Sequence, residues 1–67
     1  MKQSFNYTDS TGKPLSLYDV VICKTMTKSG EYAKLIGTVV KFLPYNHVKV
    51  STDGGKYTVH TYDVRLM

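Results

Sequence analysis

The side chains best suited to chemistry are three lysines, a threonine, a histidine and a tyrosine in the second half of the chain. They are Lys41, Lys49, Lys56, Thr58, His60 and Tyr62. Lysine ammonium groups neutralise phosphates, and aromatic or imidazole rings stack on unpaired bases, so this set suits a single-stranded nucleic acid. The ordinary alternative is the solvated outer face of a small sheet, which uses the same residue types. Both interpretations stay open.

A polar segment over residues 26–34 carries further candidates. It contains a glycine and separates two apolar runs, which predicts a long surface loop, the place where binding residues concentrate on a rigid scaffold. Lys28 and Lys34 are therefore additional candidates for phosphate contacts. Tyr32, together with Tyr45 in a second turn, is a candidate for a protein interface, because tyrosine combines a large apolar area with a polar tip. The alternative for the segment is a mobile connector.

No set of residues has the spacing of a reaction centre or of a metal site. Cys23, His47 and His60 lack the paired Cys-x-x-Cys or His-x-x-x-His spacing that zinc sites use. Cys23 stands in an apolar run, which predicts a buried thiol with a raised pKa rather than a nucleophile. The carboxylates stand mostly at turns and strand ends, where they cap backbone groups. We therefore expect no enzymatic activity, no metal and no cofactor.

Length and charge narrow the class of protein. The chain has 67 residues, enough for one domain with a thin core. Its formal net charge of +4 biases encounters toward anionic partners. Eight of the nine cations are lysines, which contact phosphates as point charges and do not read bases through a guanidinium fork. A single cysteine and the lack of a long apolar stretch favour a soluble, cytoplasmic protein without membrane contact.

Alternation of apolar and polar residues predicts an all-β fold that positions these side chains. Extended segments are expected over residues 20–25, 35–43, 47–52, 57–62 and 63–67. The Asp53-Gly54-Gly55 sequence predicts a hairpin turn, and Gly37 predicts a bulge or a close backbone approach. Residues 1–8 are expected to form an extended N-terminal arm. The last segment is expected to close a small antiparallel barrel after at most one helical turn.

The order of several short motifs resembles a known family. They are Asp9-x-x-Gly12-x-Pro14-Leu15, Asp19-x-Val21, Gly37-Thr38-Val39 and Asp63-Val64-Arg65-Leu66. This order resembles the small SH3-like barrel proteins encoded by tailed bacteriophages, and the Gly-x-Val centre is similar to KOW- and Tudor-like barrels. The resemblance spans residues 9–67 and implies a five-stranded barrel that docks RNA, DNA or a protein. Two departures are that Tyr18 replaces a common glycine and that the chain lacks the tryptophans used to hold proline-rich peptides.

The residues and the resemblance together predict a small non-enzymatic binding module with a basic surface. The first expectation is a phage factor in the host cytoplasm that associates with nucleic acid or with the transcription machinery. The alternative is a regulator or inhibitor that binds a host or phage protein. Both classes stay open at the level of the sequence.

Overall fold

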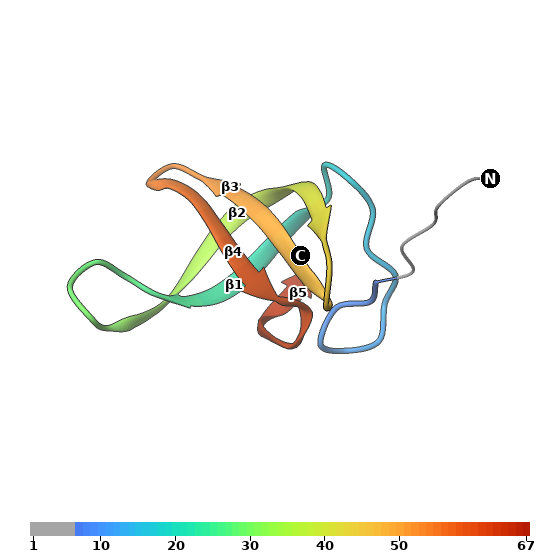
Figure 1. Cartoon of the computed structure of the whole chain (residues 1–67), viewed down its shortest axis with the longest axis horizontal. Helices are drawn as coiled ribbons and strands as arrows, with labels where there is room; N and C mark the ends of the chain where they lie inside the picture. The colour runs from blue at the N-terminus through green and yellow to red at the C-terminus, as the bar shows by residue number, and fades with distance from the viewer. Residues whose placement is uncertain (1–6) are drawn as a thin grey trace.

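The strands follow from the alternation of β-branched and polar residues between turns. The computed structural model of the chain describes residues 7–67, so most of the expected arm over residues 1–8 lies outside the described part. The elements are β1 (Val20–Met26), β2 (Tyr32–Leu43), β3 (His47–Thr52), β4 (Gly55–His60), the 3-10 turn η1 (Thr61–Asp63) and β5 (Val64–Leu66). The strands form one antiparallel sheet in the order β4-β3-β2-β1-β5 (Figure 1), which confirms the expected all-β fold.

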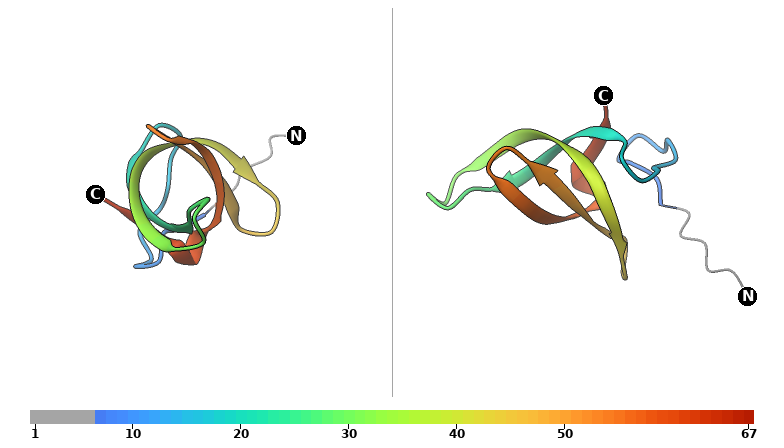
Figure 2. Two further views of the ribbon diagram at one scale, coloured as in Figure 1. Left: turned by 90° about the vertical axis from the view of Figure 1, so that its left-hand side faces the viewer. Right: turned by 90° about the horizontal axis from the view of Figure 1, so that it is seen from above.

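Strand β2 is long and bent, and it belongs to both halves of the sheet. Its first part pairs with β1 up to Thr38, and its second part pairs with β3 from Gly37 onward. A Cβ atom at Gly37 would lie 2.5 Å from the backbone oxygen of Ser51, which confirms the predicted close approach. The pairing with β3 shifts register between Val39 and Lys41, as in a β-bulge. Both features help the sheet to curl around its core (Figure 2).

The expected closure into a barrel is wrong for the hydrogen bonding of the described residues. There, β4 and β5 are the two edges of the sheet and do not pair with each other. The 3-10 turn η1 leads from β4 to β5, and β5 pairs with β1. On the far side of β5, the N–H of Ser10 donates to the carbonyl oxygen of Val64 at 2.8 Å. The sheet stays open because the N-terminal turn, rather than β4, bonds to β5.

The expected long loop over residues 26–34 is also wrong. Met26 ends β1 and lies opposite Tyr32, the first residue of β2, so the two strands form a hairpin. Residues 27–31 connect them, and the N–H of Thr27 donates to the carbonyl oxygen of Glu31 at 2.8 Å. Most polar residues of this segment lie in that turn, at the tip of a two-stranded extension of the sheet (Figure 1). The predicted loop was too long, because it included the end of β1 at Met26 and the start of β2 at residues 32–34.

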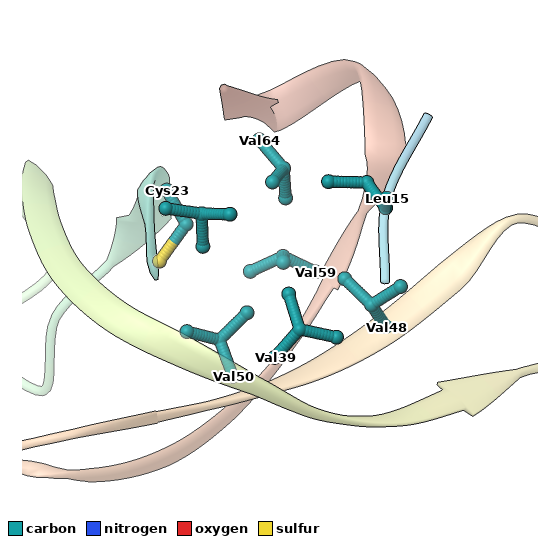
Figure 3. Packing of buried hydrophobic residues seen from close by; sticks show 8 residues of the cluster. Leu15, Cys23, Val39, Val48, Val50, Val59 and Val64 are labelled. Atoms are coloured by element: carbon teal, nitrogen blue, oxygen red, sulfur yellow. The ribbon is translucent and has the colours of Figure 1, made fainter. Parts of the chain in front are cut away.

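The core is a small cluster of buried apolar side chains, most of them valines. They are Leu15, Val21, Cys23, Val39, Val48, Val50, Val59 and Val64 (Figure 3). On β3 the buried valines alternate with Lys49 and Ser51, as predicted. On β1 the same alternation leaves Val20 50% exposed. Tyr7 packs against the cluster, and its ring meets Phe42 edge-on at a centroid distance of 5.5 Å.

The thiol of Cys23 is fully buried, which confirms the predicted burial. Desolvation raises the pKa of this thiol, so the reactive thiolate form is disfavoured. We expect a thiol reagent to label the native protein at least about tenfold more slowly than the urea-unfolded chain, because reaction requires local opening. Labelling of the native protein at the rate of the unfolded chain would contradict this.

Tyr18, at a position where the proteins that the sequence resembles often have glycine, has an unusual backbone conformation. Its φ of +70° lies in the left-handed region, which glycine adopts without cost and which costs other residues about 1–2 kcal/mol. Its N–H donates to the carbonyl oxygen of Val39 at 2.6 Å, and the N–H of Val39 donates back to Asp19 at 3.0 Å. These two bonds hold Tyr18 beside β2, and the positive φ explains why a glycine suits this position.

Asp9 fastens the N-terminal turn to the last strand. Its side chain is only 4% exposed. The Oδ1 atom accepts the N–H groups of Thr11 and Lys13, both at 2.9 Å, and the hydroxyl of Thr11 at 2.7 Å. The Oδ2 atom accepts the N–H of Leu66 at 2.9 Å. Burial by itself raises the pKa of Asp9, but the bonds from Leu66, Thr11 and Lys13 outweigh it and lower the pKa to about 2.

Candidate nucleic-acid interface

The outer face of β2, β3 and β4 carries three of the lysines predicted to contact phosphates. The strand register sets Lys41 opposite Lys49 and Lys49 opposite Thr58. We call these two lysines and the threonine the lysine row. Lys56 lies opposite Ser51 on the same face. These side chains point away from the core because the alternate positions of β3 and β4 hold the buried valines. The sheet therefore gathers the central part of the predicted set.

The lysine row contains two like charges on directly opposite positions. Lys41 is exposed and Lys49 is half-buried. Like charges placed directly opposite each other in neighbouring strands destabilise a sheet. A bound anion relieves this repulsion. The pair is therefore well suited to a phosphate group.

Three rings stand beside the lysine row, and we call His47, His60 and Tyr62 the ring row. His47 and His60 are opposite each other in β3 and β4, with ring centroids 5.1 Å apart and planes at 79°. The ring of Tyr62 lies 4.7 Å from that of His60, with planes at 41°. The Nδ1 atom of His60 accepts the N–H of Tyr62 at 3.1 Å, which places the proton of the neutral imidazole on Nε2. Tyr62 is 80% exposed and is available for stacking on a base.

Of the remaining predicted residues, Lys28, Lys34 and Tyr32 lie toward the turn between β1 and β2 and do not join this face. Lys28 lies in the turn between β1 and β2, and Lys34 lies on the first part of β2 opposite Lys24. Tyr32 begins β2, whereas Tyr45 follows its end, in the turn before β3. The two tyrosines predicted for a protein interface therefore lie near opposite ends of a long strand (Figure 1). They do not form one surface.

Sequence reasoning missed three residues that the structure brings to these surfaces. His47 joins the ring row only because β3 pairs with β4 in the register that sets it opposite His60. Lys24 and Arg65 lie on another part of the surface, where β1 pairs with β2 and β5. Both residues alternate with buried residues of their strands and face outward. Alternation does not show which strands are neighbours, so their partners stayed hidden.

Neither a metal-binding group nor a match to a known protein assigns this chain to a functional class. Among residues 7–67, no group of three or more His, Cys, Asp or Glu side chains is placed to hold a metal ion. Within the same range, no helix has the length and apolar character needed to span a membrane. No protein-family model, no curated protein and no solved structure matches the chain. A functional proposal therefore depends on the geometry of the surface.

Proposed function

We propose that the protein is a small non-enzymatic binding module that takes single-stranded nucleic acid on the outer face of β2, β3 and β4. The observation that carries the proposal is that the ring row stands directly beside the lysine row. His47 is two residues from Lys49 in β3, and His60 is two residues from Thr58 in β4, so each pair shares a face. In this arrangement the rings stack on bases while the ammonium groups contact the phosphates between them.

An SH3-like fold and a phage origin are part of the same proposal. Five antiparallel strands, a long bent β2 and a 3-10 turn before the last strand support the class that the sequence resembles. The open edge between β4 and β5 is a difference from a fully closed barrel. Association with the transcription machinery in the host cytoplasm follows from the resemblance, and binding of nucleic acid is the part supported by the geometry.

Binding on this face is expected to depend on charge and to tolerate many sequences. The formal net charge of the chain is +4, and its single arginine, Arg65, lies on β5 and not in the lysine row. No guanidinium fork is therefore present in the lysine row to read base edges. Stacking accepts any base, and lysine contacts with phosphates weaken as salt rises.

Replacing Lys41 and Lys49 together with alanine is expected to weaken binding of a fluorescein-labelled oligo(dT). Each phosphate contact to a single strand contributes about 0.7 to the slope of log affinity against log salt, so the slope should fall by about 1.4. Fluorescence anisotropy over a salt series measures both quantities. Both side chains point away from the core, and the circular dichroism spectrum should stay unchanged.

A matched control removes the same charge elsewhere. Lys13 and Lys28 lie in the N-terminal turn and in the turn between β1 and β2, so their double alanine variant loses two charges outside the lysine row. It should leave the salt slope close to that of the unaltered protein. An equal loss in both double variants would show that net charge alone drives binding. An unchanged slope in the Lys41 and Lys49 variant would place the contacts on another surface.

A further inference from the structure

An apolar strip faces solvent on β1 and on the first part of β2. Ile22 lies directly opposite Ile36 across the two strands. Ile36 is 59% exposed and Val20 is 50% exposed, while Ile22 is half-buried. Met67 extends the strip, because its N–H donates to the carbonyl oxygen of Val20 at 3.2 Å and its side chain is 66% exposed. Neighbouring apolar side chains exposed on one face are typical of a contact surface.

Three cations border this apolar strip. Lys24 and Lys34 lie directly opposite each other, two residues along the strands from Ile22 and Ile36. Arg65 of β5 lies opposite Ile22 on the other side of β1. The outward positions of β5, β1 and β2 therefore combine a central apolar pair with positive charge on two sides.

A cavity of about 200 Å³ lies where the strip and the cations meet. Its lining includes Ile22, the three cations and the single acidic residue Asp63. Three positive charges against one negative charge leave the cavity positive. Lys24 and Lys34 repel each other across the strands, and a carboxylate between them relieves the repulsion. The cavity is smaller than the sites that hold drug-sized ligands, and it suits one acidic side chain better than a whole small molecule.

We propose that this surface docks an acidic segment of a partner protein, with apolar side chains of the segment on the strip and a carboxylate in the cavity. Charge complementarity selects this occupant. A second copy of the chain, with its net charge of +4, would bring the same cations against each other in a two-fold contact. Nucleic acid supplies anions but no aliphatic side chains to cover Ile36 and Val20.

This docking surface shares only Tyr62 with the proposed nucleic-acid interface. The strip lies on β1 and the first part of β2, whereas the lysine row begins on the second part of β2 and continues onto β3 and β4. Tyr62 belongs to the ring row and also lines the cavity, so it is a poor choice for separating the two surfaces. Ile36 and Lys34 belong to the docking surface alone.

The test uses a short fluorescein-labelled peptide in which leucines are flanked by glutamates, and a sister peptide with serines in place of the leucines. The leucine peptide should bind the full chain at least about tenfold more tightly than the serine peptide, because only leucine covers the strip. In isotope-labelled protein, the peptide should shift the backbone amide signals of β1, of the first part of β2 and of β5. The signals at the centre of β3 should move little.

Two variants and one control show which residues of the docking surface contribute to the affinity for the leucine peptide. Ile36→Thr keeps a β-branched residue in the strand and should weaken binding of the leucine peptide about fivefold or more. Lys34→Glu should weaken it at least about tenfold, because it places a negative charge beside the incoming carboxylate. Lys13→Glu makes the same charge change at an exposed site in the N-terminal turn and should have a much smaller effect. Amide spectra of the free variants check that each remains folded.

Several outcomes would reject the proposal. Equal affinity for the two peptides, or an unaffected Ile36→Thr variant, would mean that charge alone attracts the peptide. Binding weaker than about 1 mM would place the contact in the range of non-specific encounters. Displacement of the peptide by oligo(dT) in the Tyr62→Ala variant, which lacks the one shared ring, would show that both ligands compete for one surface. Phosphatidylserine vesicles that bind through Ile36 while the leucine peptide does not would identify a lipid surface as the occupant.

Discussion

Replacing Asp9 with asparagine is expected to lower the free energy of unfolding by about 2 kcal/mol at neutral pH. Asparagine keeps the size of the side chain, but it removes the charge and can place an amide group where Oδ2 accepts the N–H of Leu66 at 2.9 Å. The N–H group of β5 then faces another donor, or Thr11 and Lys13 do if the amide turns around. In a domain of this size the change corresponds to roughly 10 °C in Tm. Thermal and urea unfolding followed by circular dichroism measure it.

The same carboxyl group makes stability depend on pH in acid. The pKa of Asp9 falls from 3.8 to about 2 in the folded protein, so the folded state favours the charged carboxylate. This contribution is complete above the ordinary pKa of 3.8 and is lost as the pH falls toward about 2. The difference in unfolding free energy between the unaltered protein and Asp9→Asn should therefore shrink across that range. Urea unfolding at a series of pH values tests this directly.

Asp53→Asn is the matched control for Asp9. Asp53 is exposed in the turn between β3 and β4. Its replacement should change the unfolding free energy by no more than about 0.5 kcal/mol, as is usual for surface positions. A similar loss in the two variants would contradict the special role of Asp9. A difference that stayed constant down to pH 2 would show that the charge of Asp9 does not contribute.

Replacing Tyr62 with alanine is expected to weaken binding of labelled oligo(dT) by about tenfold or more. Stacking of one base on an aromatic ring is worth about 1–3 kcal/mol, and Tyr62 offers the most exposed ring of the ring row. The side chain is 80% exposed, so the substitution should leave the fold intact. Anisotropy titrations at one fixed salt concentration measure the change. The salt slope should stay the same, because no cation is removed.

Two further variants separate stacking from other effects of Tyr62. Tyr62→Phe keeps the ring and should retain most of the affinity. Tyr32→Ala removes a ring that is 71% exposed at the start of β2, outside the ring row, and should bind like the unaltered protein. A loss in Tyr62→Phe as large as in Tyr62→Ala would assign the effect to the hydroxyl group. Equal losses in Tyr32→Ala and Tyr62→Ala would remove the ring row from the proposed interface.

Much of the local structure was determined by the sequence itself. The strand expected over residues 47–52 is β3, His47–Thr52, and its valines alternate with Lys49 and Ser51 as expected. Burial of Cys23 and the close approach at Gly37 were also predicted. These features are local, because side chains in a strand alternate between its two faces and only glycine lacks a Cβ atom. The outward direction of the lysines follows from the same alternation.

The tertiary structure alone decided which of these outward residues become neighbours. Pairing of Met26 with Tyr32 turned an expected loop into a hairpin and set Lys24 opposite Lys34. The bond from Leu66 to Asp9 joins residues 57 positions apart and binds the last strand to a turn instead of to β4. Strand register and edge pairing depend on the total hydrogen bonding and packing of distant segments. Period-two alternation excludes register shifts of one residue, but it does not choose among shifts of two residues or say which strands are neighbours. For that reason the faces could be predicted from the sequence, whereas the place of His47 in the ring row and the cation cavity could not.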